Sequence, residues 1–236
     1  MIFNLTGIRF SPSEIKRGFV LPEESSEELS EEIGLHIGDG SMNFYKYNNK
    51  FRGLYSLRGH LKDDRTHYEF RIKQLYEDLF NLKLSLREMK SSGVFGFQKW
   101  SNALVTFKKR LGLSLGVKYK IDIPRFILKS RKSCLCVTRG IFDTDGTIYL
   151  EKKNNSLYPR VIIGTISKQL AFRLKKLISG FDINATLYTE RRAHKGWNDF
   201  FVISVRGDKM LHKWMETINP ANPKHMKKYQ FYLDNH

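Results

Sequence analysis

The sequence has little cysteine and no long apolar run. Its two cysteines, Cys134 and Cys136, stand one residue apart, a spacing that suits neither a disulfide framework nor a four-ligand zinc site. No apolar run approaches the ~20 residues that a helix needs to cross a bilayer. The first residues lack the order of charged, apolar and small residues that marks a secretory signal. We therefore expect a protein of a reducing compartment, the cytoplasm of a prokaryotic cell or an organellar matrix, that is neither secreted nor bound to a membrane.

Acidic residues are also scarce. The 236 residues carry 41 Lys and Arg against 24 Asp and Glu, a net charge of +17. Seven of the acids stand between Pro22 and Gly40, where there is no Lys or Arg, so the rest of the chain carries 41 bases against 17 acids. Such a field attracts polyanions, and nucleic acid is the first partner to consider. Acidic proteins or acidic membranes are the alternative, but no basic amphipathic helix or polybasic tail favours them.

The chain contains ample material for a packed core. Hydrophobic residues make up 41% of it, with 17 Phe and 11 Tyr, which excludes a disordered polypeptide. Its length fits one large domain or two of roughly 100–120 residues.

Two stretches of the sequence repeat each other. Residues 32–40 read EIGLHIGDG and residues 138–146 read TRGIFDTDG. In each, a glycine is followed four residues later by a small residue and then by Asp-Gly, and Asp39 and Asp145 stand 106 positions apart. This repetition predicts a duplicated chain.

The same order of helices and strands is expected in both halves, α-β-β-α-β-β-α. The repeated stretches end helices, Asn-rich turns near residues 48 and 154 join strands, and helical periodicity marks the stretch that begins at residue 66 and the stretch from residue 168 to Gly180. We expect a strand near residues 82–87 and a last helix over residues 208–218. The predicted fold class is α+β, with residues 1–27 as an N-terminal extension, 28–130 as the first half including a linker, and 131–236 as the second half.

The repeated motif brings two carboxylates together. Small residues four positions apart form a groove along one helix face, so two such helices can pack backbone to backbone. The predicted seam is formed by Gly34 and Gly38 on one helix and by Gly140 and Thr144 on the other. The aspartates that follow would repel each other unless cations lie between them, and paired Asp oxygens suit Mg²⁺ held together with substrate phosphates. Taken singly, each Asp-Gly pair is also typical of a helix end that starts a hairpin.

These stretches resemble the two signature helices of single-chain LAGLIDADG homing endonucleases. The segment LGLSLGVKYKIDIPRFI followed by LCVTRGIFDTDGTIYL is similar to the link into the second repeat of that family. The resemblance covers about residues 28–236. It implies two pseudo-symmetric αββαββα halves, each with a curved antiparallel sheet, and the signature helices packed at the interface. It also implies a monomer that cuts both strands of double-stranded DNA at a long site, with Mg²⁺ or Mn²⁺ as cofactor and with Ca²⁺ occupying the site without supporting cleavage.

The resemblance also assigns roles to particular residues. Asp39 and Asp145 would be the metal ligands, assisted by the carbonyls of Gly38 and Thr144. Lys62 and Lys168 match the family's basic residue after the second strand, which would order the attacking water, although each could also be an exposed lysine that contacts solvent or phosphate. Lys118 and Lys224 are expected to hold DNA phosphates.

Alternate side chains of the strands would read the DNA bases. The candidates are Asn43, Tyr45, Tyr47, Arg52, Tyr149, Glu151, Lys153, Arg160, Tyr188, Glu190 and Arg192.

The sequence leaves a second function open. An RNA maturase, which would bind intron RNA, or a DNA-binding regulator could keep this fold without cleavage. Such proteins often lose a signature acid, whereas both acids are present here, so the endonuclease is the preferred interpretation. No residues of intein splicing stand at the ends of the chain, and a free-standing or intron-encoded enzyme is therefore expected.

Overall fold

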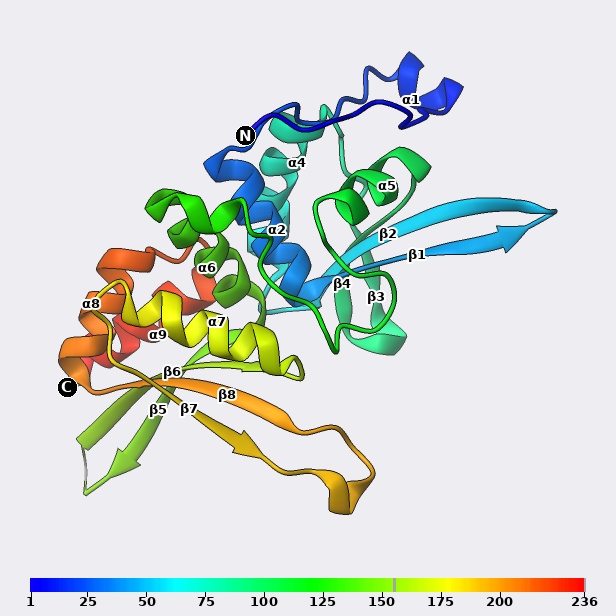
Figure 1. Ribbon diagram of the computed structural model, residues 1–236. Helices are drawn as coiled ribbons and strands as arrows, with labels where there is room; N and C mark the ends of the chain where they lie inside the picture. The colour runs from blue at the N-terminus through cyan, green and yellow to red at the C-terminus, as the bar shows by residue number, and fades with distance from the viewer. Residues whose placement is uncertain (155, 236) are drawn as a thin grey trace.

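The chain forms two similar halves, each built from one sheet and its helices (Figure 1). This computed structural model describes residues 1–154 and 156–235, and for Tyr47 and Lys195 it describes only the backbone. The first half contains α2 (Glu27–Asp39), β1 (Gly40–Tyr47), β2 (Lys50–His60), α3 (Arg65–His67), the π-helical segment η1 (Tyr68–Ile72), α4 (Lys73–Phe80), β3 (Arg87–Met89), η2 (Lys90–Ser92), β4 (Val94–Trp100) and α5 (Asn102–Arg110).

The second half repeats this order of helices and strands, and it adds η3 (Ile127–Lys129) before α6 (Arg131–Asp145) and α9 (Pro223–Asp234) after α8 (Asp208–Ile218). Between α6 and α8 it contains β5 (Gly146–Lys153), β6 (Ser156–Thr165), α7 (Lys168–Ser179), β7 (Ala185–Glu190), η4 (Ala193–Lys195) and β8 (Phe200–Arg206). The N-terminal extension contains the short α1 (Pro12–Lys16) and lies along the first half (Figure 1).

Helices α2 and α6 begin and end in the same way. The side chains of Ser26 and Ser130 accept hydrogen bonds from the backbone N–H groups of Leu29 and Ser133, as N-caps do. Each helix ends at a glycine with extended backbone, which is already the first residue of the next strand. An aspartate is therefore the last helical residue in both halves, at the point where helix passes directly into strand.

Each half contains a four-stranded antiparallel sheet. The strand orders are β1-β2-β4-β3 and β5-β6-β8-β7, which confirms the predicted α+β fold with two sheets. In the turn between β1 and β2, Asn48 and Asn49 have φ of 45° and 58°, the left-handed conformation that two-residue hairpins require. Asn154 has φ of 46° at the matching place in the second half.

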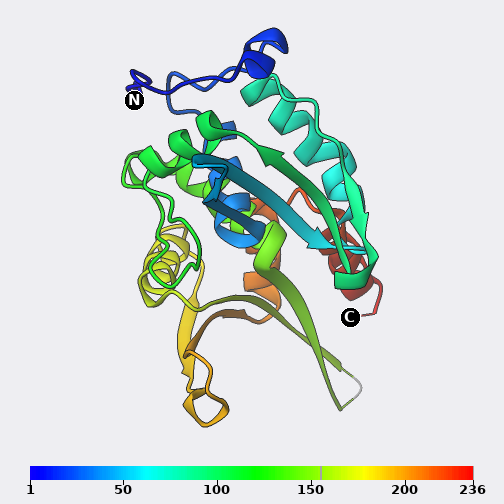
Figure 2. The same ribbon diagram turned by 90° about the vertical axis from the view of Figure 1, so that its right-hand side faces the viewer.

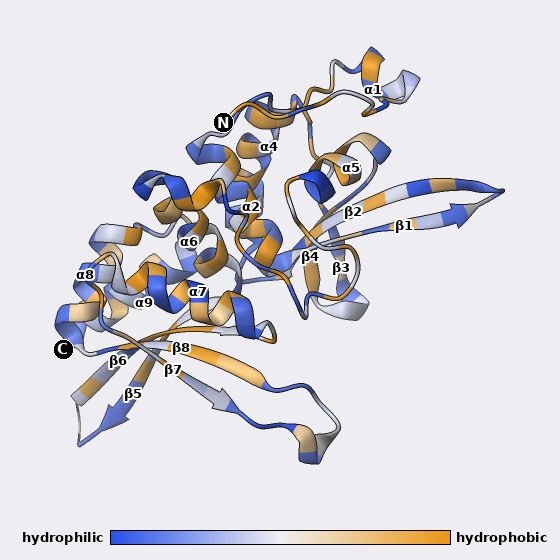
Figure 3. Ribbon diagram, in the orientation of Figure 1, coloured by the Kyte–Doolittle hydropathy of each residue, from blue (hydrophilic) through white to orange (hydrophobic). Residues whose placement is uncertain are grey.

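One face of each sheet is covered and the other is left bare. Met42, Tyr55, Leu57 and Phe97 point into the core of the first half, under helices α2 and α5. In the second half Ile148, Val161, Ile163 and Ile203 do the same beneath α7 and α8. Figure 2 shows the two sheets extending from the central helix pair with their helices on one side. Orange and blue segments alternate along several strands in Figure 3, as expected for sheets with one covered face.

Two sequence predictions about the elements are wrong. The expected strand near residues 82–87 is displaced, since β3 spans only Arg87–Met89. Helix α8 is not the last one, because α9 follows it. The start of α9 is marked in the sequence by Asn222, whose side chain accepts a hydrogen bond from Lys224 N, and by Pro223 in the first turn. Among the described helices, none is long and apolar enough to cross a membrane.

Candidate active site at the helix seam

Helices α2 and α6 meet backbone to backbone. A Cβ atom built on Gly34 would lie 2.4 Å from the carbonyl oxygen of Val137, and one on Gly140 would lie 2.3 Å from that of Glu31. Contacts this short leave no room for any side chain. The two glycines therefore set the distance between the helices, which pack against each other more extensively than any other pair of helices.

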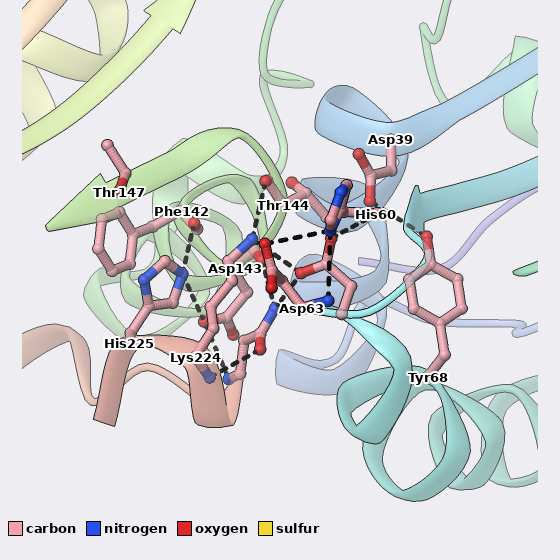
Figure 4. A network of polar contacts seen from close by, with 12 residues as sticks. Asp39, His60, Asp63, Tyr68, Phe142, Asp143, Thr144, Thr147, Lys224 and His225 are labelled. Atoms are coloured by element: carbon pink, nitrogen blue, oxygen red, sulfur yellow. Dashed lines mark hydrogen bonds and ion pairs between the residues drawn. The ribbon is translucent and has the colours of Figure 1, made fainter. Parts of the chain in front are cut away.

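The seam continues to the ends of the helices and brings the two aspartates together. A Cβ on Gly38 would lie 1.9 Å from Thr144 Oγ1 and 3.4 Å from the carboxyl carbon of Asp145. Asp145 thus packs beside the residue that precedes Asp39. Figure 4 shows Asp39 and Thr144 at this junction. The four residues predicted to form the seam lie where the helices approach most closely.

The surroundings of the two carboxyls raise the pKa of both. Burial, then the nearby charges of Asp145 and Asp64, raise the pKa of Asp39 to about 7, against a hydrogen bond of 3.1 Å from Tyr68 Oη. Burial raises the pKa of Asp145 to about 6, while Lys118 and Lys224 act in the opposite direction. Asp145 keeps an exposed edge, so water offsets part of its rise. Without a cation, this place disfavours two negative charges.

Two lysines stand beside the acid pair. Lys118 Nζ donates hydrogen bonds of 3.0 Å to the carbonyl oxygens of His36 and Ile37 and a third to that of Gly38. Lys224 Nζ contacts the carbonyl oxygen of Thr144 at 3.3 Å. The C-terminal ends of helices carry partial negative charge, which explains why an ammonium group sits at the C-terminal end of each of these two helices. Like the aspartates, these lysines are 106 positions apart.

The donor set fits a hard divalent cation. Within residues 1–154 and 156–235, no hydrogen bond or salt bridge reaches the Asp145 carboxylate, and Asp39 accepts only the bond from Tyr68. That part of the chain holds no group of three or more His, Cys, Asp and Glu side chains suited to a metal. Mg²⁺ commonly uses one or two carboxylates and takes its other oxygens from water and substrate phosphates, so a pair of aspartates with no ion-pair partner among the described residues suits it.

A cavity of about 390 Å³ opens beside the acids. It is lined by Lys118 and Asp145, by the end of α2 at Gly38, and by Thr147 and Ile162 of the second sheet. Larger cavities lie beside the N-terminal extension and on α7, and neither is lined by Asp39 or Asp145. The cavity at the seam, which Asp145 and Lys118 line, is therefore the one that belongs to the acid pair.

Two other predicted basic residues do not contact the acids. Lys62 and Lys168 are exposed, and among the described contacts neither forms a hydrogen bond or ion pair with Asp39 or Asp145. Lys168 instead lines the cavity on α7. The lysines at the acid pair are Lys118 and Lys224, to which the sequence assigned only phosphate contacts. Their common offset of 106 residues is a signal that could have linked them to the aspartates.

The predicted base-reading residues share the bare faces of the sheets. Directly opposite residues of an antiparallel pair point to the same side, and Tyr45 stands opposite Arg52 as Tyr149 stands opposite Arg160. The side chain of Tyr47 lies outside the described part of the structure. By strand alternation the same faces hold Asn43, Glu151, Lys153, Tyr188 and Glu190.

Some of these residues are already paired, and a further aromatic side chain lies on the bare face of the first sheet. Glu151 accepts a hydrogen bond from Arg160, while Arg192 lies beyond the end of β7 and pairs with Glu190. The exposed Trp100, which the sequence analysis did not select, packs edge-on against Tyr45 with ring centroids 6.1 Å apart. The signal available in the sequence was a tryptophan at the end of a strand-like stretch.

A network of hydrogen bonds, which was not predicted from the sequence, holds Lys224 in place. The buried carboxylate of Asp143 accepts hydrogen bonds from the backbone N–H groups of Ala221 (3.0 Å) and Asn222 (3.1 Å). The side chain of Asn222 then donates to Asp143 O at 2.9 Å and to Asp64 Oδ1 at 2.7 Å. The start of α9, and with it Lys224, is thereby fixed under the end of α6 (Figure 4).

Comparison with known proteins places this architecture in a class. Residues 137–219 match the family model described as the LAGLIDADG-like domain. The comparison with curated protein sequences gave no match. Among solved structures, I-DmoI in complex with DNA and Ca is similar over 81% of this chain and 88% of its own, with 17% identity and a TM-score of 0.58.

Two further solved structures have a similar fold. The homing endonuclease I-WcaI bound to its DNA recognition sequence is similar over 99% of this chain and 98% of its own, with 15% identity and a TM-score of 0.57. The LAGLIDADG meganuclease I-AabMI bound to uncleaved DNA is similar over 89% and 90%, with 13% identity and a TM-score of 0.53.

The class is thus defined by fold: a single chain with two sheets and a central helix pair, built like the homing endonucleases. More particularly, residues 137–219 of the second half match the model of the LAGLIDADG-like domain. Both findings confirm the family resemblance read from the two signature stretches.

Proposed function

We propose that this protein is a site-specific endonuclease that hydrolyses both strands of double-stranded DNA with a divalent metal ion. The observation that carries the proposal is the meeting of Asp39 and Asp145, one from each half, at a seam flanked by two bare sheet faces. A lysine stands beside each acid. Structures of similar fold contain DNA, with Ca, Mn or Mg named in several of them.

The two aspartates would hold the metal, with the carbonyl oxygens of Gly38 and Thr144 close enough to assist. When bound, such an ion supplies Lewis-acid catalysis and lowers the pKa of its water. Water would add to the phosphorus atom, the bond from phosphorus to the leaving oxygen would break, and that oxygen would take up a proton.

The residues of the chain contribute position and charge. The glycine seam fixes the distance between the carboxylates, and this distance sets where a scissile phosphate can sit. The ammonium groups of Lys118 and Lys224 lie where charge would build up on the phosphate oxygens, and they would stabilise it. The bare faces, rich in Arg, Lys and Tyr, would hold the duplex on either side through phosphate and base contacts.

Selection from a randomised duplex library tests this function. The protein is incubated with the library and Mg²⁺ or Mn²⁺, and cut molecules are recovered and sequenced. The same experiment is run with Asp39→Asn and Asp145→Asn, which keep the shape of each side chain and remove its charge. We expect the parent to enrich one long site, and both variants to bind that site without cutting it.

A different result would identify the alternative function. If the parent binds duplex DNA tightly but never nicks it with either metal, the protein is a regulator that kept the fold. If it binds structured intron RNA in preference to DNA and does not nick DNA, it is a maturase.

A further inference from the structure

The two lysines of the site have different partners, although they occupy matching positions. We propose that the carboxylate of Asp64 neutralises Lys224, so that the two DNA strands are cut one after the other, the strand at Lys118 first. This inference rests on the proposed function and assigns a role to Asp64 that the sequence did not suggest.

Lys118 keeps its positive charge available. Its hydrogen bonds go to three backbone carbonyl oxygens at the end of α2. Carbonyl groups are dipoles that orient an ammonium group without cancelling its charge.

Lys224 is paired directly with a carboxylate. Its Nζ lies 2.8 Å from Asp64 Oδ1 and 3.3 Å from the single carbonyl oxygen of Thr144. Asp64 is 4% exposed, so little water screens the pair. The other oxygen of Asp64 accepts a hydrogen bond of 2.7 Å from the backbone N–H of His60, and Asn222 donates to Oδ1. Asp64 is therefore held in place on both sides and cannot turn away from Lys224.

The first half of the site has no equivalent of this pair. At the offset of 106 residues, Asp64 corresponds to Leu170, and Asn222 corresponds to Gly116. Asp143, which fixes the segment before Lys224, corresponds to the apolar Ile37. The whole chain of contacts that leads to Lys224 is thus specific to one side of an otherwise repeated arrangement.

This difference predicts unequal rates. A lysine hydrogen-bonded to a buried carboxylate stabilises charge on a phosphate less than a lysine hydrogen-bonded only to carbonyl groups does. We expect the strand served by Lys224 to be cut about tenfold more slowly, which equals a difference of about 1.4 kcal/mol in the barrier. A nicked duplex should therefore accumulate before both strands are cut.

The experiment follows each strand separately. A duplex recovered from the library selection is labelled at each 5′ end, and single-turnover rates are measured with Mg²⁺. Asp64→Asn should accelerate the slow strand about tenfold relative to the fast strand. Asp63→Asn is the matched control: it removes the same charge at the adjacent position, from an exposed side chain that contacts His60 and not Lys224. In a Lys224→Met background, Asp64→Asn should leave the ratio of the two strand rates unchanged.

A binding measurement gives a second readout that needs no cleavage. Affinity for a duplex of random sequence is measured at several salt concentrations in EDTA. If Asp64→Asn frees Lys224 to contact a phosphate, the slope of log K against log[salt] becomes steeper by about 0.9. Asp63→Asn should leave the slope unchanged.

Each result decides the proposal. Equal rates for the two strands of the parent, or equal acceleration of both strands by Asp64→Asn, would overturn it. If Asp64→Asn does not fold, Lys118→Met and Lys224→Met are compared instead, and a greater loss of rate with Lys224→Met overturns the proposal. If the parent cuts no duplex, the proposed function fails, and the salt dependence alone still shows whether Asp64 neutralises Lys224.

Discussion

Replacing Gly140 by alanine tests whether the helix seam sets the geometry of the site. A methyl group there would lie 2.3 Å from Glu31 O and 2.8 Å from Leu35 N, both backbone atoms of α2. Neither atom can turn aside as the end of a side chain could. The helices must therefore separate, and Asp39 and Asp145 separate with them.

The size of the effect follows from these distances. An ordinary contact needs at least 3.4 Å, so the helices must move apart by about 1 Å. Overpacking of this kind costs about 1–3 kcal/mol, and the better helix propensity of alanine returns up to ~1 kcal/mol. We expect a net loss of about 1 kcal/mol in the free energy of unfolding. A displacement of ~1 Å between catalytic groups can lower a rate about 100-fold.

Three measurements are needed. Urea unfolding gives the stability, single-turnover cleavage of a selected duplex with Mg²⁺ gives the rate, and calorimetric titration with Ca²⁺ reports metal binding without cleavage. Gly180→Ala is the control, since a methyl group at this helix end has its nearest neighbours at 3.2 and 3.5 Å, far from the seam. We expect Gly140→Ala to fold, to bind DNA as the parent does, and to lose Ca²⁺ affinity together with rate.

A Gly140→Ala protein that folds and cuts at the parental rate, with unchanged Ca²⁺ titration, would refute this reasoning. It would mean that the aspartates do not depend on the close approach of α2 and α6.

Two further predictions concern buried charges. Lys108 Nζ lies 2.6 Å from Glu32 Oε2, and both side chains are fully buried, so Lys108→Met should cost about 3–5 kcal/mol by leaving a buried charge unpaired. Adding Glu32→Gln should restore most of this stability in urea unfolding, and an additive loss would contradict the explanation. For Asp39, a pKa raised to about 7 in the folded protein means that the folded state binds more protons than the unfolded state, so stability is lost as pH rises through 7. Asp39→Asn in EDTA should therefore be more stable than the parent at pH 8, by about 1–2 kcal/mol after allowance for solvent access, with the gain shrinking as pH falls toward 5; an equal gain at both values would rule out this cause.

The repeat made much of the fold predictable. Glycine grooves, helical periodicity and Asn-rich turns are local signals, and they gave the two helices and two sheets because local preference and tertiary structure agree at those places. Asp39 and Asp145 could be chosen because both stand in the same repeated motif.

The rest of the site depends on contacts between distant parts of the chain. Lys118 and Lys224 each follow their aspartate by 79 residues, and only the folded chain brings them back to the helix ends. Asp64 belongs to one half and Lys224 to the other, so no pattern within either half predicts their contact. Because the chain is rich in lysine, local sequence does not distinguish Lys118 and Lys224 from the other lysines. Only the packing of the helices does.

The charges of the site explain how it can exist without a metal and still attract one. Two aspartates at one seam would repel each other, yet the ammonium groups of Lys118 and Lys224 stand at the same helix ends. With Asp64 included, three acids face two bases, so full ionisation leaves about one negative charge in a half-buried place. The raised pKa of Asp39 removes part of that charge near neutral pH. A divalent cation would displace the proton and reverse the sign, and the site would then attract a phosphate. With this balance of charges, the helices can pack without the ion, and the bound ion would then supply the affinity for DNA at this point.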